Sequence, residues 1–176
     1  MSLERWVANS DVRHGHFKGS EFYRSNQILN GFDSPYEYDL RAILLMNFIR
    51  SRFGKALFLN SAGRTPVYNS SIGGGSKSYH LILTKKEASD RGISWRPVQA
   101  FDLSVYNGDL LDYEEFKNFV WDNRPVLFMM GLRGLAFYDD DLFIHFDVRD
   151  SDDLVYWNDE TSEKGDPRDF FKVKIF

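Results

Sequence analysis

Residues 37–53 carry apolar side chains at the spacing of one face of an α-helix, and this pattern constrains the fold more than any other part of the chain. The residues that follow this spacing are Leu40, Ile43, Leu44, Phe48 and Ile49. Gly54 is expected to end this helix. Residues 109–123 form a second helical segment that Pro125 is expected to end, and short apolar runs at 56–59, 99–105 and 142–148 predict β-strands. The pattern therefore predicts helices alternating with short strands.

The composition narrows the kinds of site that such a chain can build. A length of 176 residues favours one domain with a substantial core, and 43% hydrophobic residues argue against disorder. The net charge of −4 argues against nucleic acid as the main partner. The chain has no cysteine, which excludes disulfides and thiolate ligands. Any transition-metal site must therefore use His, Asp or Glu.

Neither a signal peptide nor a membrane span is expected. The first ten residues lack an apolar core of signal-peptide length. No run approaches the ~18 apolar residues that a membrane helix needs. We therefore expect a soluble protein, cytoplasmic as synthesised, whose export would need another component. The oligomeric state stays open.

Three residues on separate segments form a candidate metal site. His80 follows the glycine-rich turn 73–75, while Asp102 and His145 lie within predicted strands. Two histidines and a carboxylate are a usual ligand set for a catalytic metal. The alternative, in which the histidines are structural residues, stays open on the residues alone because only the fold could bring the three together. His14 and His16 could also chelate a metal, but a solvated loop is preferred there.

Further polar residues are candidates for the chemistry around such a site. Residues 141, 143, 145 and 147 alternate onto one strand face, which makes Asp147 and Asp141 candidate general bases. Arg64 follows a predicted strand and could anchor an anionic group, or form a surface salt bridge.

The remaining segments are less regular. Residues 60–75 are predicted as loop, and their glycines lack the context of a phosphate-binding loop. Residues 81–97 are predicted as an excursion or hairpin that flanks a site. Residues 126–130 could be strand or helix, and the apolar run 170–176 is expected to form an edge strand.

Several segments from about Phe17 to Trp157 together resemble the peptidase M15 family. The helix ending Phe-Ile-Arg-Ser-Arg-Phe-Gly resembles the family's lead-in to a strand. Residues 61–66, with Asn69, resemble "SxYRxPxxN", and residues 74–80 resemble "GGxxxSxH". Residues 99–103 resemble "xAxDI", and Phe-Ile-His-Phe-Asp-Val-Arg at 143–149 resembles "FVHVDVR", with Trp157 following. The order of these segments is more specific than any one of them.

The resemblance implies a function and assigns residues to it. It implies a D-Ala-D-Ala carboxypeptidase-like enzyme that binds Zn²⁺ through His80, Asp102 and His145, with Arg64 and Ser78 at the substrate. The expected substrates are peptidoglycan stem peptides, cleaved by a D-Ala-D-Ala carboxypeptidase or an L-Ala-D-Glu endopeptidase of bacterial or phage origin. The expected fold is α+β, with helices on a small, mainly antiparallel sheet that carries a zinc-binding cleft.

The chain departs from the family pattern at three places. The family motif "SxHxxGxAxD" is split here, so residues 81–98 are expected to be an insertion within a single domain of 1–176, and 158–176 a C-terminal extension. Gly63 replaces the tyrosine beside the arginine. Leu142 stands where members carry an acidic base. A catalytically degenerate cell-wall-binding protein or a phage structural protein is therefore the alternative.

Overall fold

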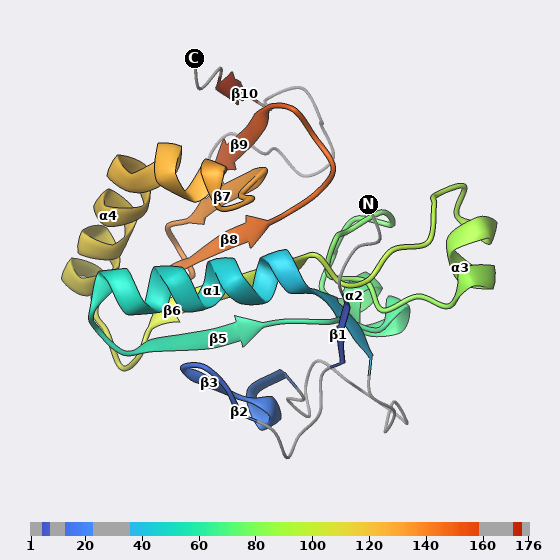
Figure 1. Ribbon diagram of the computed structural model, residues 1–176, viewed down its shortest axis with the longest axis horizontal. Helices are drawn as coiled ribbons and strands as arrows, with labels where there is room; N and C mark the ends of the chain where they lie inside the picture. Colours follow the sequence, from blue (N-terminus) through green and yellow to red (C-terminus); the bar gives the residue numbers. More distant parts are fainter. Residues whose placement is uncertain (1–4, 8–12, 23–35, 159–170, 174–176) are drawn as a thin grey trace.

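A computed structural model describes residues 5–7, 13–22, 36–158 and 171–173, and its centre is a six-stranded β-sheet (Figure 1). The strand order is β10-β9-β7-β8-β6-β5. The strands are β5 (Leu57–Ser61), β6 (Ala100–Val105), β7 (Gly134–Tyr138), β8 (Phe143–Asp147), β9 (Leu154–Asn158) and β10 (Phe171–Val173). Neighbouring strands are antiparallel except for the parallel pair β7 and β9. The expected α+β class with a mainly antiparallel sheet is confirmed.

The helix α1 (Leu40–Phe53) packs against α4 and β6. It begins three residues later than expected, because residues 37–39 form strand β4 (Glu37–Asp39) and Asp39 caps the helix by accepting a bond from the Arg41 N–H. It ends at Gly54 as expected. Leu44 is 54% exposed, so its assignment to the apolar face was wrong. The buried stripe is instead centred on Leu45, Met46 and Ile49.

The helix α4 (Leu110–Met129) continues through the proline that was expected to end it. Asp109 is its N-cap and forms a capping box with Asp112. Pro125 has no N–H to donate to the carbonyl of Trp121. The Arg124 guanidinium donates to that carbonyl instead and lies 4.4 Å from the centre of the Trp121 ring. This replacement bond explains how the helix passes Pro125 and includes most of residues 126–130.

The two faces of the sheet differ in chemistry because side chains alternate along each strand. Phe101, Leu103, Ile144 and Phe146 belong to the apolar core with residues of α1 and α4. The intervening residues of the same strands include Asp102, His145 and Asp147, which are buried polar groups. The alternation predicted for these strands therefore separates the apolar core from a polar face.

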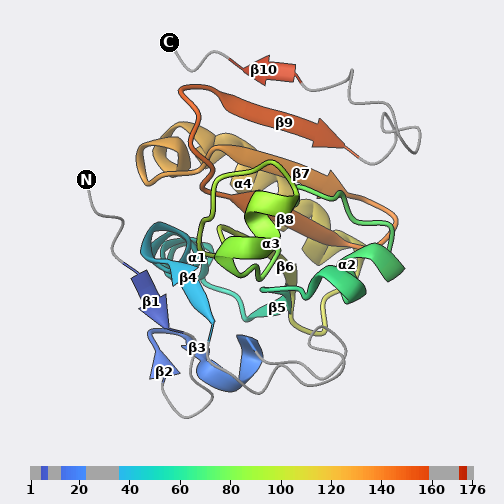
Figure 2. The ribbon, with the colours of Figure 1, turned by 90° about the vertical axis from the view of Figure 1, so that its right-hand side faces the viewer.

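The segments between the strands contain short helices that the sequence pattern did not predict. Residues 60–75 include the helix α2 (Pro66–Ser71), which Thr65 caps. Residues 81–98 include the helix α3 (Lys85–Asp90) where a hairpin was considered, and a capping box of Thr84 and Glu87 begins this helix. In Figure 2, α2 and α3 lie nearer the viewer than the sheet, with α4 behind it.

Near the N-terminus, β1 (Arg5–Val7) pairs with β4, and β2 (Arg13–His14) pairs with β3 (Phe17–Lys18). The 3-10 helix η1 (Gly19–Phe22) follows. His16 is exposed, as expected, but β2 and β3 form a hairpin where an irregular loop was expected. β10 occupies a sheet edge, where an edge strand was expected. Among the described residues, no helix combines the length and the apolar character that crossing a membrane requires.

Candidate metal centre

Two of the three predicted ligands are cross-strand neighbours in the sheet. Asp102 on β6 lies opposite His145 on β8. The same transverse row continues to Ser61 on one side and to Ala136 and Trp157 on the other. Because Ala136 has only a methyl group, the Trp157 ring reaches over it to lie 5.2 Å from the His145 ring. The register of the four strands β6, β8, β7 and β9 thus places a carboxylate, an imidazole and an indole in one row.

His80 reaches the same place from the loop that precedes α3. The loop runs beside the end of β5, where the Arg64 N–H donates to the His80 carbonyl at 2.7 Å and the Ile82 N–H donates to the Arg64 carbonyl at 2.9 Å. The buried Asn69 side chain donates to the Gly75 carbonyl at 3.0 Å and holds the glycine turn. Ser78 Oγ accepts from the His80 N–H at 3.3 Å. Ser78 therefore shapes the turn around His80, and its substrate contact stays a prediction.

The three side chains converge on one point. His80 Nε2 lies 3.1 Å from His145 Nδ1 and 3.2 Å from Asp102 Oδ1, and His145 Nδ1 lies 2.9 Å from Asp102 Oδ1. Two ligands of a tetrahedral zinc ion lie about 3.3 Å apart, given metal–ligand bonds of about 2.0–2.1 Å. The triangle of donor atoms therefore fits one small metal ion, and all three residues are buried.

Each histidine is oriented by a bond from its other ring nitrogen. His80 Nδ1 lies 2.6 Å from the Ala62 carbonyl, and His145 Nε2 lies 3.2 Å from Asp147 Oδ2. A carbonyl can only accept, so the proton of neutral His80 is on Nδ1 and the lone pair on Nε2 faces the other ligands. Bonds of this kind hold metal-binding histidines in most metal sites. The arrangement thus has both an inner ligand set and an outer supporting set.

The protonation states of His80 and Asp102 also suit metal ligands, whereas His145 must lose a proton to bind a metal. Burial and the nearby Arg64 guanidinium lower the pKa of His80 to about 4, so this imidazole is neutral at pH 7. Although burial opposes it, the electrostatic interactions with His80 and the Arg64 guanidinium, and hydrogen bonds to His145 and His80, hold the pKa of Asp102 well below its usual range. Burial lowers the pKa of His145, but hydrogen bonds to Asp102 and Asp147 outweigh it, so the pKa of His145 is raised. A metal ion would take the place of the proton that His145 shares with Asp102.

Arg64 lies inside the centre instead of on the surface. Its Nη2 forms an ion pair with Asp102 Oδ2, and its Nε donates to Ser61 Oγ at 2.7 Å. The surface salt bridge considered as its alternative role is therefore wrong, because the Arg64 side chain is only 14% exposed. This pairing directs Asp102 Oδ1 towards the two histidines. The contact of Arg64 with a substrate stays a prediction.

The two candidate bases occupy different environments. Asp147 is fully buried, and both of its oxygens accept from the Arg149 guanidinium, while Oδ2 also faces His145. It therefore lies behind the His145 ring, on the side away from His80. Asp141 is exposed in the turn between β7 and β8. Leu142 has a φ of 54°, which interrupts the alternation that was used to place Asp141 on the His145 face.

Gly134 is a supporting residue that the sequence did not reveal. It is the cross-strand partner of Asp147, and a Cβ at this position would lie 2.0 Å from Asp147 Oδ2. Only the pairing of β7 with β8 identifies this contact, since it depends on the register of the two strands. Gly63 similarly leaves room for the Tyr36 ring, which would lie 2.6 Å from an added Cβ. The Tyr36 ring, from the residue before β4, thus occupies the space beside Gly63, which stands where the family pattern has a tyrosine.

We expect Gly134→Ala to weaken metal binding by about tenfold or more, because a displaced Asp147 no longer orients His145. Chelator-competition titration of the purified variant measures this affinity. Gly75→Ala is the matched control, since a Cβ there meets nothing within 4 Å and its φ is not positive. Equal affinity of Gly134→Ala and Gly75→Ala for the metal would contradict this role of Gly134.

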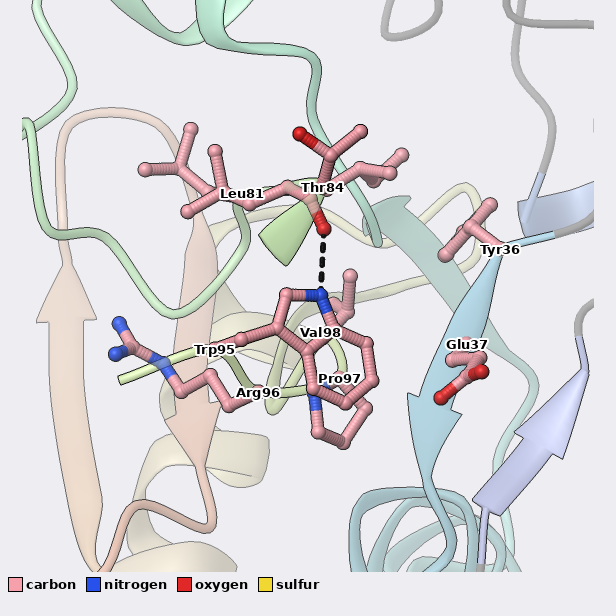
Figure 3. A pocket seen from close by; sticks show the side chains of 10 residues that line it. Tyr36, Glu37, Leu81, Thr84, Trp95, Arg96, Pro97 and Val98 are labelled. Atoms are coloured by element: carbon pink, nitrogen blue, oxygen red, sulfur yellow. Dashed lines mark hydrogen bonds between the residues drawn. The ribbon is translucent and has the colours of Figure 1, made fainter. Parts of the chain in front are cut away.

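A hollow of about 170 Å³ is lined in part by residues that begin with Leu81, directly after His80 in the chain. Its lining includes Tyr36, Leu81, Trp95 and Val98, and Trp95 Nε1 donates to the Leu83 carbonyl at 2.8 Å (Figure 3). The segment 81–98 therefore contributes most of its wall, while α3 lies away from the sheet (Figure 1).

Comparison with known proteins agrees with this arrangement. Residues 15–147 match the family described as Peptidase M15. Searches of curated proteins and of solved structures found no significant match. The matched residues cover most of the chain and include all three metal-ligand candidates and Arg64. This protein belongs to the peptidase M15 family.

Proposed function

We propose that this protein is a zinc-dependent peptidase that hydrolyses the stem peptides of peptidoglycan, as a D-Ala-D-Ala carboxypeptidase or an L-Ala-D-Glu endopeptidase. The observation that carries the proposal is the buried triangle of His80 Nε2, Asp102 Oδ1 and His145 Nδ1. Two imidazoles and one carboxylate, with no thiolate in the chain, suit zinc. Three protein ligands leave a fourth position for water or substrate.

The chain supports this chemistry with named residues. A zinc ion bound here would polarise the scissile carbonyl and make its bound water more acidic. Asp147 fixes the ring of His145, and Ala62 fixes that of His80. Arg64 orients Asp102 and is the candidate anchor for an anionic end of the substrate. Asp141 stays a candidate for the general base, since the bonds of Asp147 to Arg149 and His145 favour a positioning role.

The proposal is tested by digestion of purified muropeptides and of a synthetic stem peptide ending in D-Ala-D-Ala. Zinc-loaded protein is expected to give products that mass spectrometry identifies, either free D-alanine or the fragments of cleavage between L-Ala and D-Glu. A chelator should stop the reaction, and added Zn²⁺ should restore it. Metal-loaded protein that yields neither product would refute the proposed activity.

The alternative is a protein that binds cell wall without turnover. It is favoured by Leu142 at the position of the family's acidic base and by the pairing of Asp147 with Arg149. Zinc binding and retention on insoluble peptidoglycan, without release of any fragment, would support this alternative over the peptidase.

A further inference from the structure

We propose that Arg96, which lies over the Tyr79 ring that Arg149 also contacts, forms a subsite for a carboxylate of the substrate peptide next to the metal centre. The inference rests on the proposed function, because it assigns a recognition group to the same peptide. It adds a determinant from the segment 81–98, which the family motif does not contain.

The subsite contains two guanidinium groups on one aromatic ring. Arg96 Cζ lies 4.2 Å and Arg149 Cζ lies 4.5 Å from the centre of the Tyr79 ring. Such stacking holds the planar guanidinium in a defined orientation and leaves its N–H groups at the rim for hydrogen bonding. The arrangement therefore places two positive charges close to one aromatic ring, each with oriented donors.

The two arginines differ in how their charges are balanced. Arg149 is paired with the buried carboxylate of Asp147. Within the part of the chain that the structure describes, Arg96 has no salt bridge, and its Nη2 donates only to the carbonyls of Lys77 and Ser78, at 2.8 and 3.5 Å. The Arg96 side chain is half-buried, and this burial lowers the pKa of Arg96. A carboxylate would supply the balancing charge through charge-assisted bonds.

The subsite is connected directly to the metal ligands. Tyr79 precedes His80, and the Tyr79 carbonyl accepts from the Gln99 N–H at 3.0 Å. The Gln99 carbonyl accepts from the Val148 N–H, also at 3.0 Å. Gln99 thus links the backbone of Tyr79 to the residue that precedes Arg149. Arg149 in turn lies 5.4 Å from the Trp157 ring that contacts His145. A peptide held at the metal centre would therefore pass close to these side chains.

Arg96 is among the residues that line the neighbouring hollow, but its guanidinium contacts Tyr79 and the turn before His80. Figure 3 shows it extending away from Tyr36 and Glu37, on the opposite side of the segment from them. The segment 81–98 thus lines the hollow and also carries a guanidinium to the turn before His80.

Stem peptides carry carboxylates at the C-terminus and on the D-glutamate residue, and matched peptides distinguish these sources. We would compare a free stem peptide with one amidated at the C-terminus and one amidated at the D-glutamate α-carboxylate. Binding is measured by calorimetry with metal-free protein, in which no turnover occurs, and kcat/KM with zinc-loaded protein. Wild type is expected to prefer the free form over one of the amides by about tenfold or more.

Arg96→Gln is expected to remove this preference, and Arg96→Lys to retain part of it because the charge remains. Arg91→Gln is the matched control: Arg91 lies on the same segment and its Nη1 faces the Ser76 carbonyl at 3.5 Å, but it is not stacked on Tyr79. It should keep the wild-type preference. The preference is a ratio between two peptides, so a general loss of stability does not change it.

The outcomes separate the subsite from the proposed activity. Equal binding of free and amidated peptides by wild type, or an unchanged preference in Arg96→Gln, would overturn the subsite. A preference that Arg96→Gln abolishes, in a protein that hydrolyses none of the peptides, would leave the subsite standing and refute the peptidase. Hydrolysis of the peptides without any preference would support the peptidase and overturn the subsite.

Discussion

Alanine in place of His145 is expected to abolish stoichiometric zinc binding and peptide hydrolysis. The imidazole supplies one of three donor atoms that lie 2.9–3.2 Å apart. Without it, His80 and Asp102 provide only two ligands, and Arg64 remains paired with the carboxylate. Two ligands do not hold a catalytic zinc ion at the affinity of three. We therefore expect loss of the metal together with loss of turnover.

Metal analysis after dialysis, together with product analysis of a stem peptide, measures both effects. His16→Ala is the matched control, because His16 is exposed in the β2–β3 hairpin and its backbone N–H, which donates to Asn47, is kept in the variant. His16→Ala should retain zinc and activity. If neither wild type nor His145→Ala contained zinc after loading, the proposed metal centre would be refuted.

Asp147→Asn is expected to lower zinc affinity by about 10–100-fold, as the loss of a supporting residue around a metal typically does. The neutral amide no longer stabilises the orientation of His145, and it leaves the Arg149 guanidinium without its buried counter-charge. Breaking a buried ion pair costs about 3–5 kcal/mol when one partner loses its charge. The free energy of unfolding should therefore fall together with the metal affinity.

The same variant distinguishes a positioning residue from a general base. A positioning role predicts that excess zinc restores much of kcat, whereas a general-base role predicts normal zinc affinity and a low kcat at every zinc concentration. Asp141→Asn is the companion variant, because Asp141 is exposed and its loss should leave zinc affinity and stability unchanged. A fall in kcat in Asp141→Asn alone would identify the base. Normal zinc affinity in Asp147→Asn would contradict the positioning role.

Regular elements with strong local signals could be predicted from the sequence. The helices around Ile49 and Phe116 and the strands around Asp102 and His145 follow from periodicity, which reflects burial of one face. Local rules failed where a specific tertiary or side-chain contact compensates for them. Pro125 stays inside α4 because Arg124 satisfies the Trp121 carbonyl. Residues 66–71 form α2, whose start has local signals in Thr65 as the cap and Pro66 at the first turn; the loop-like composition around them concealed these signals.

The sequence by itself determined the chemistry of the centre: without cysteine, the ligands had to be imidazoles and carboxylates, and the motif segments identified His80, Asp102 and His145. Only the tertiary structure decided that their donor atoms meet, because strand register and the Arg64–Leu81 bridge set those distances. It also decided that Arg64 pairs with Asp102, that Asp147 lies behind His145, and that Gly134 makes room for it. The physical reason is that side-chain type is local information, whereas pairing between residues distant in the chain depends on how the whole sheet packs.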